Sequence, residues 1–251
     1  MVEPVADRSS DLRAQLAALA AGRSDWLDAV TVGLRERAFL TGAWLYGSLA
    51  SESDDPFSDV DLVVVFDESM PGEVLRDPVN GLGLPGQVLF TRGKPRNAPL
   101  GGGYRAVCLD LDGLPLLVDL CLWPTATATV PAGSRVLHET GTLPRSELGF
   151  MALMDRHRTT DSRGADPDAA ENILFLTQLA AKYLARGDRE RQEAIHDQLG
   201  LPPDTAAPGL ARMLRDRIDL AGHPELAPAV TAAGRLIDLA DAVAAARHRT
   251  A

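Results

Sequence analysis

The chain has few features of a secreted or membrane protein. It contains only two cysteines, Cys108 and Cys121, which are too few for a disulfide framework and lack the spacing of a zinc site. Both fall in apolar runs, so we expect two buried thiols. The chain shows no signal peptide, and no apolar run approaches the roughly 20 residues that cross a bilayer. We therefore expect a cytoplasmic protein with no membrane partner.

Positive charge is also scarce. The 251 residues carry 25 lysines and arginines against 35 aspartates and glutamates, a formal net charge of −10. Proteins that bind nucleic acid tightly gather cations on one face, because phosphate contacts supply most of their affinity. We therefore expect no nucleic-acid partner. The apolar and charged fractions are those of an ordinary globular protein with a sizeable core.

Hydrophobic patterning divides the chain into two halves with different expected secondary structure. The first half contains two helical segments separated near Gly22, followed by several short apolar runs that are typical of strands. After about Pro144 no strand pattern remains, and alanine, leucine and arginine at helical spacing predict helices. The expected strands are 43–46, 59–66, 87–92, 104–112, 114–123 and 134–139, and the expected later helices are 146–157, 167–186, 188–199, 206–221 and 224–248.

This pattern predicts an α+β fold. A small mixed β-sheet with flanking helices should form a first domain over residues 1–144, and an α-helical bundle should form a second domain over residues 145–251. The runs on either side of Gly113 are predicted to form a hairpin, because a tight glycine turn separates two β-rich segments. The mixed sheet carries the residues on which a functional prediction can be based.

The most informative segment is LYGSLASESDDPFSDVDLVVVF, residues 45–66. Gly47 and Ser48 end one expected strand, and Asp59 and Asp61 begin the next. Side chains alternate along a strand, so these two aspartates should project from the same face, about 7 Å apart. Gly47 lets the backbone approach a phosphate group closely, and Ser48 can donate a hydrogen bond to a phosphate oxygen. The segment therefore predicts a site for a metal and a phosphate.

A third carboxylate is expected from Asp119, which lies in an otherwise apolar strand and would be costly to bury without a partner. Asp110 and Asp112 are alternatives, but both lie beside Gly113 and look like solvated turn residues. Two like charges 4 Å apart repel by about 4 kcal/mol at an effective dielectric constant near 20. Magnesium relieves this repulsion and prefers oxygen ligands. We therefore predict two Mg²⁺ ions held by Asp59, Asp61 and Asp119, the three expected catalytic residues.

These residues resemble the signature of the DNA polymerase β-like nucleotidyltransferase superfamily. That signature is an apolar residue, Gly, Gly or Ser, then after about ten residues Asp-apolar-Asp, and a later acidic residue on another strand. The resemblance covers about residues 40–125, and the helical second half is similar to that of the aminoglycoside nucleotidyltransferases. It implies ATP or another nucleoside triphosphate, magnesium, transfer of a nucleoside monophosphate to an acceptor hydroxyl, and release of pyrophosphate. It also implies that residues 1–144 form the nucleotidyltransferase domain and that the helical residues 145–251 bind substrate.

The chain departs from the family pattern just after the Gly-Ser pair. Many members have an arginine and a glycine there, whereas this chain has Ala50 and Ser51. Another cation must then neutralise the triphosphate, and Lys182 is the candidate, on a helical stripe with Glu171. A solvated helix lysine is the alternative. Nucleotide binding is therefore assigned to Gly47, Ser48, Ser58 and Lys182, and Glu171 is a weaker candidate for the general base.

Four functions follow from these residues, of which extension of transfer RNA or of a poly(A) tail is disfavoured by the acidic net charge. The leading one is adenylylation of a small hydroxylated molecule, such as an aminoglycoside-like antibiotic in resistance, since an acidic protein attracts a polycation. The second is nucleotidylation of a protein, as in the toxin–antitoxin type, which the extra helical residues disfavour. The third is a catalytically silent nucleotide-binding regulator, which would be expected to lack one of the aspartates.

Overall fold

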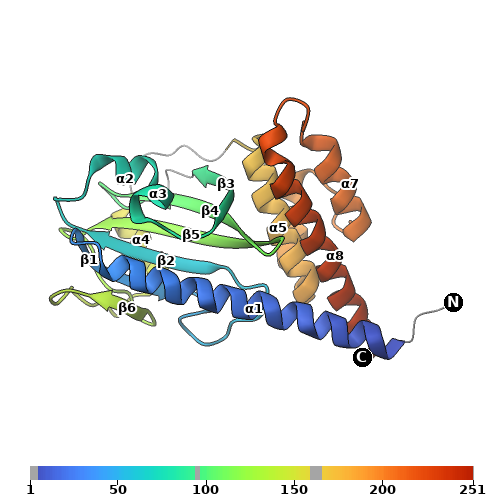
Figure 1. Ribbon diagram of the computed structural model, residues 1–251, viewed down its shortest axis with the longest axis horizontal. Helices are drawn as coiled ribbons and strands as arrows, with labels where there is room; N and C mark the ends of the chain where they lie inside the picture. Colours follow the sequence, from blue (N-terminus) through green and yellow to red (C-terminus); the bar gives the residue numbers. More distant parts are fainter. Residues whose placement is uncertain (1–4, 94–96, 159–165, 251) are drawn as a thin grey trace. The chain divides into compact units, whose positions relative to one another are not determined.

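The computed structural model confirms an α+β fold (Figure 1). It describes residues 5–93, 97–158 and 166–250. A six-stranded mixed sheet with flanking helices is followed by a helical C-terminal stretch. The strands are β1 (Leu40–Tyr46), β2 (Val60–Phe66), β3 (Gln87–Gly93), β4 (Gly103–Leu111), β5 (Leu114–Pro124) and β6 (Arg135–Glu139).

The strand order is β3-β4-β5-β2-β1-β6. Strand β2 pairs in parallel with β5 and antiparallel with β1, which in turn pairs antiparallel with β6. The long apolar run of β2 fits this central position, because a strand covered on both faces needs no polar alternation. The β4–β5 connection is the expected hairpin, and Asp112 and Gly113 form its turn with φ values of 52° and 85°. Positive φ at both positions is typical of a type I′ turn.

Both faces of the sheet are buried. On one face, Trp44, Val63 and Trp123 form a core cluster with Leu153 and Met154 of helix α4 (Phe150–His157). Side chains that alternate with these, such as those of Leu45, Leu62 and Leu120, point to the opposite face and are fully buried. Figure 1 shows the second half of helix α1 (Val5–Arg35), from Arg23 onward, in front of the sheet and α4 behind it. The sheet is therefore the middle layer of this part of the molecule.

Helix α1 is one continuous helix, although the sequence predicts two helices separated near Gly22. A glycine inside a helix costs only about 1 kcal/mol relative to alanine, so burial on either side of it can outweigh the cost. Leu19, Trp26 and Val30 are all buried. The two short helices between β2 and β3 are α2 (Gly72–Arg76) and α3 (Pro78–Leu82).

Contacts group the chain into two compact units. The sheet unit comprises residues 23–109 and 116–165, and the helical unit comprises 1–22, 110–115 and 166–251. Helix α4 belongs to the sheet unit because Leu153 and Met154 pack into its core, whereas the predicted boundary at 144–145 places it with the later helices. In the ranges that the structure describes, no helix is long and apolar enough to cross a membrane.

The helical unit contains the expected C-terminal helices. They are α5 (Ala170–Arg186), α6 (Arg189–Leu199), α7 (Ala207–Arg217) and α8 (Ala227–Thr250), which follows a short 3-10 turn, η2 (Pro224–Leu226). Helix α5 contacts α6, α7 and α8. As the sequence predicts, α5 ends at Gly187 and α6 at Gly200, both in the left-handed conformation that closes a helix.

Candidate functional site

Two of the three predicted aspartates face each other on neighbouring strands. Asp61 of β2 is in register with Asp119 of the parallel strand β5, and with Tyr46 of β1 on its other side. Cross-strand neighbours lie on the same face of a sheet, so these three side chains form one polar row. Both aspartates are partly exposed among strands that are otherwise almost wholly buried. The predicted placement of Asp119 on a strand beside Asp61 is confirmed.

Gly47 lies directly against the first of these carboxylates. Its φ is 71°, a conformation that side chains with a Cβ rarely adopt. A Cβ at this position would overlap with Oδ2 of Asp61. Glycine is therefore required at position 47 for two reasons. It permits the turn that follows β1, and it allows the Asp61 carboxylate to lie close to the backbone.

Asp59 immediately precedes β2 and is partly exposed. It does not line the cavity that Asp61 and Asp119 share. In the described part of the chain, no three histidine, cysteine or acidic side chains are gathered closely enough to hold an ion by themselves. The geometry therefore provides a pair of carboxylates, those of Asp61 and Asp119, and Asp59 precedes Asp61 by two positions in the sequence.

The loop between Ser48 and Asp59 is held from inside the sheet unit by Arg23 of α1. The Arg23 guanidinium is buried and donates hydrogen bonds to the backbone oxygens of Asp55 (2.7 Å) and Ser58 (3.0 Å). It also forms an ion pair with the carboxylate of Asp54 at 2.5 Å. Nothing in the amino-acid sequence singles out this arginine. Its contacts fix the path of the chain just before Asp59.

We expect the Arg23→Met substitution to lower the free energy of unfolding by about 2–3 kcal/mol. Methionine keeps much of the volume but leaves buried carbonyls without their charged donor. Arg35→Met on the same helix is the control, because Arg35 is exposed and makes a single 3.1 Å bond to the Leu137 backbone oxygen. It should cost no more than about 0.5 kcal/mol. Urea unfolding of both variants tests this, and equal losses would contradict the role of Arg23.

Two tyrosines surround the carboxylate pair. The hydroxyl of Tyr104 on β4 donates a 2.7 Å hydrogen bond to Oδ1 of Asp119. Burial, followed by the charge and hydrogen bond of Asp119, raises the pKa of Tyr104 well above its ordinary value. Burial and then the charges of Asp61 and Asp119 do the same to the pKa of Tyr46. Both phenols therefore remain protonated at neutral pH and can donate hydrogen bonds.

A cavity of about 270 Å³ opens beside the polar row. Helix α4 supplies one wall, where Phe150 stacks on Tyr46 with ring centroids 3.7 Å apart. Asp155 and Arg158, at the end of this helix, form an ion pair with each other. The lining residues, all in the sheet unit, are Tyr46, Asp61, Asn97, Tyr104, Asp119, Phe150, Met151, Met154, Asp155 and Arg158.

The remaining predicted nucleotide contacts lie outside this cavity. The backbone oxygen of Ser48 accepts a hydrogen bond from the Ser53 amide at 3.1 Å, within the loop after β1. Ser58 is buried, and its hydroxyl accepts a 3.1 Å hydrogen bond from the amide of Asp55. Lys182 lies on α5 in the helical unit and is only 9% exposed, so it is not a solvated helix lysine. The nucleotide contacts of these three residues stay predictions.

Both cysteines are fully buried, as expected. Cys121 follows Asp119 by two positions on β5, and burial, with a further contribution from the Asp119 charge, raises the pKa of its thiol. We expect neither thiol to react with a disulfide reagent at neutral pH in the native protein, and both to react once it is unfolded in urea. Stoichiometric labelling of the native protein within minutes would contradict this burial.

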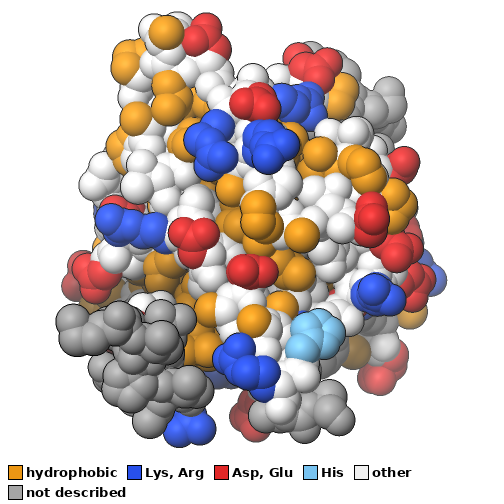
Figure 2. Space-filling view, turned by 90° about the vertical axis from the view of Figure 1, so that its right-hand side faces the viewer, with side chains coloured by type: hydrophobic (Ala, Val, Ile, Leu, Met, Phe, Trp, Pro, Cys, Tyr) orange, Lys and Arg blue, Asp and Glu red, His pale blue; other side chains and the backbone are white. Residues whose placement is uncertain are grey.

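The charges on the face drawn in Figure 2 are mixed. On the face drawn in Figure 2, acidic and basic side chains lie singly or in small groups among hydrophobic ones. The described residues of this face form no continuous basic field of the kind that follows a nucleic-acid backbone.

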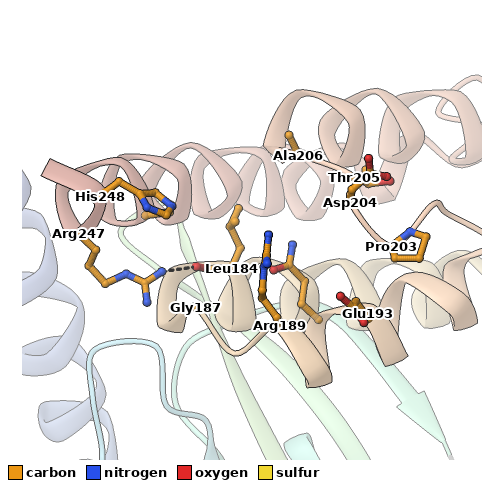
Figure 3. A pocket seen from close by; sticks show the side chains of 12 residues that line it. Leu184, Gly187, Arg189, Glu193, Pro203, Asp204, Thr205, Ala206, Arg247 and His248 are labelled. Carbon is orange, nitrogen blue, oxygen red and sulfur yellow. Dashed lines mark hydrogen bonds between the residues drawn. The ribbon is translucent and has the colours of Figure 1, made fainter. Parts of the chain in front are cut away.

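A larger groove, of about 800 Å³, lies in the helical unit. Figure 3 shows Arg247 and His248 of α8 at one end and Asp204 and Thr205 near the other. Nη2 of Arg247 donates a 2.8 Å hydrogen bond to the backbone oxygen of Leu184. None of the predicted site residues, all of which lie in the described part of the chain, lines this groove. We therefore place the candidate site at the smaller cavity, where the paired carboxylates are.

In comparisons with known proteins, no family model and no curated protein matches this chain. The resemblance to nucleotidyltransferases therefore rests on the Gly-Ser and Asp-x-Asp motif and on the strand geometry around it.

The carboxylate pair can be compared with what a magnesium site requires. Mg²⁺ keeps several water ligands and is usually bound by one or two carboxylates together with substrate phosphates, so an all-protein cage is not required. Asp61 and Asp119 supply those two carboxylates, and Asp59 is the nearest further candidate along the chain. The residues present therefore fit a cation that is completed by a phosphate ligand.

Proposed function

We propose that this protein is a magnesium-dependent nucleotidyltransferase. It transfers a nucleoside monophosphate, AMP from ATP in the simplest case, to a hydroxyl group of a small molecule and releases pyrophosphate. One observation carries the proposal: Asp61 and Asp119 are in register on adjacent parallel strands, with the positive-φ Gly47 against Asp61. The reaction class is inferred from the resemblance of the Gly-Ser and Asp-x-Asp motif to that of nucleotidyltransferases.

In this proposal Asp61, Asp119 and Asp59 hold the metal. The metal, when bound, neutralises developing charge on the phosphates and on the attacking and leaving oxygens. Tyr104 orients the Asp119 carboxylate through their 2.7 Å hydrogen bond. Gly47 leaves room for the Asp61 carboxylate and for a phosphate near the backbone.

The proposed function explains why Arg23 holds the loop between Ser48 and Asp59 through several contacts. A phosphate-binding turn has to keep its geometry when a multiply charged ligand approaches, and preorganised groups need no rearrangement at the moment of reaction. Arg23 fixes the second half of this loop through Asp54, Asp55 and Ser58. We therefore assign Arg23 a positioning role, with no contact to substrate.

The test is pyrophosphate release from ATP and magnesium in the presence of a panel of aminoglycosides and other hydroxylated small molecules. An Asp59→Ala, Asp61→Ala double variant is the control. The proposal predicts release that requires both an acceptor and the two aspartates. If ATP binds with magnesium but no small acceptor supports release, a protein acceptor or a silent nucleotide-binding regulator becomes the better account. If no nucleotide binds, the proposal is wrong.

A further inference from the structure

The residues that line the cavity beside Asp61 and Asp119 indicate which chemical class of acceptor fits there. Its volume of about 270 Å³ is at the lower limit of ligand pockets, which span roughly 300–1,000 Å³. A cavity of this size holds one ring or a similarly compact group. Since it contains the two proposed metal ligands, it can receive the reacting end of a substrate.

The wall supplied by α4 is largely apolar. Phe150 stacks on Tyr46, Met154 is buried beside them, and Met151 is 69% exposed at the start of the helix. Methionine side chains are flexible and polarizable, and they are common at surfaces that adapt to apolar ligands. A large hydrophobic side chain that is exposed at the edge of a cavity indicates contact with a ligand, whereas single ones on an open surface are common.

The charges of the lining do not favour a polycation. Apart from Asp61 and Asp119, the one carboxylate among the described lining residues is that of Asp155, which is paired with Arg158. An ammonium group entering this cavity would lose its hydration without gaining an unpaired carboxylate beyond the two proposed metal ligands. Beyond the two proposed metal ligands, the described lining of this cavity therefore carries no net charge.

The polar groups that remain are suited to neutral hydroxyls. The amide of Asn97 and the phenols of Tyr46 and Tyr104 line the cavity and can exchange hydrogen bonds with hydroxyl groups. We infer that the acceptor presents a neutral hydroxylated ring with an apolar flank, such as an aryl glycoside, and that it is not a polycationic amino sugar. This inference rests on the proposed function, because it assigns the cavity to the acceptor of that reaction.

Calorimetric titration in the presence of magnesium and a non-reacting ATP analogue tests the inference. The probes are the phenyl glycosides of glucose, galactose and mannose, the three parent sugars, and kanamycin as the polycation. At least one phenyl glycoside should bind tenfold or more tightly than its parent sugar and than kanamycin. Kanamycin binding more tightly than all three phenyl glycosides would overturn the inference, as would the absence of phenyl glycoside binding.

Substitutions at two exposed hydrophobic positions test whether the phenyl glycosides bind in this cavity. Met151→Glu should weaken phenyl glycoside binding at least fivefold and strengthen kanamycin binding. Val32→Glu, on α1 at 59% exposure, introduces the same charge elsewhere and should change neither. Equal effects of the two variants would contradict the assignment. If the ATP analogue binds but no phenyl glycoside does, only this inference fails, whereas failure of the analogue to bind refutes the proposed function.

Discussion

Replacing Asp61 or Asp119 with asparagine is expected to lower kcat/KM for pyrophosphate release by about 1,000-fold or more, equivalent to roughly 4 kcal/mol of transition-state stabilisation. Asparagine keeps the shape of the side chain but removes the charge that would hold the metal. The two carboxylates should act as one unit, so the double variant should lose little more than the more severe single variant.

The fold should survive these substitutions. Asp61 and Asp119 are like charges on neighbouring strands, and removing one of them removes a repulsion. The thermal midpoint of either asparagine variant should therefore be no lower than that of the wild type. Asp112→Asn is the control, because Asp112 is exposed in the hairpin turn at a φ that asparagine also tolerates. A variant of Asp61 or Asp119 that retains activity would contradict the proposed roles.

The second large effect is expected at Gly47. Gly47→Ala should lower kcat/KM by about 100-fold, because its Cβ would displace the Asp61 carboxylate, and misplacement of a catalytic group by about 1 Å can cost this much. The substitution should also lower the free energy of unfolding by about 1–2 kcal/mol, the cost of a left-handed conformation for a residue with a Cβ.

Gly133→Ala separates these two effects. Gly133 has a φ of 75°, close to that of Gly47, but a Cβ there would meet no atom within 4 Å. The two alanine variants should therefore lose similar stability in urea unfolding, while only the Gly47 variant loses activity. If both variants lose activity to the same extent, the effect comes from backbone strain and the contact with Asp61 is not important.

The sequence predicted the sheet and the strand positions of Asp61 and Asp119 well, because local patterns determine both. The apolar run after Asp61 specifies a central strand, and alternation specifies which of its side chains share a face. The choice of Asp119 over Asp110 agrees with the geometry. Asp119 is paired in register with Asp61, whereas Oδ1 of Asp110 accepts a 2.6 Å hydrogen bond from the Gly113 amide in the turn.

The surroundings of the aspartates could not be predicted, because they come from segments far apart in the sequence. Nothing in the local pattern around Arg23 distinguishes it from other helix arginines, and only the folded structure brings it to the loop before Asp59. Phe150 and Met151 read as ordinary residues of an amphipathic helix. Their place in the cavity depends on the packing of α4 against the sheet.

Local signals were also insufficient where tertiary packing decides the outcome. A glycine after an alanine-rich helix is a typical termination signal, yet α1 continues through Gly22 to Arg35. The predicted cage of three carboxylates assumed that Asp59 would project beside Asp61 as part of the strand. The strand begins at Val60, however, so alternation does not fix the direction of the Asp59 side chain.

Calorimetric titration of a non-reacting ATP analogue, with and without magnesium, tests the central claim most directly. The account predicts binding that requires magnesium in the wild-type protein and is lost in Asp61→Asn and in Asp119→Asn, but kept in Asp112→Asn. Binding that is independent of magnesium and unchanged in both aspartate variants would contradict the claim, and so would the absence of nucleotide binding.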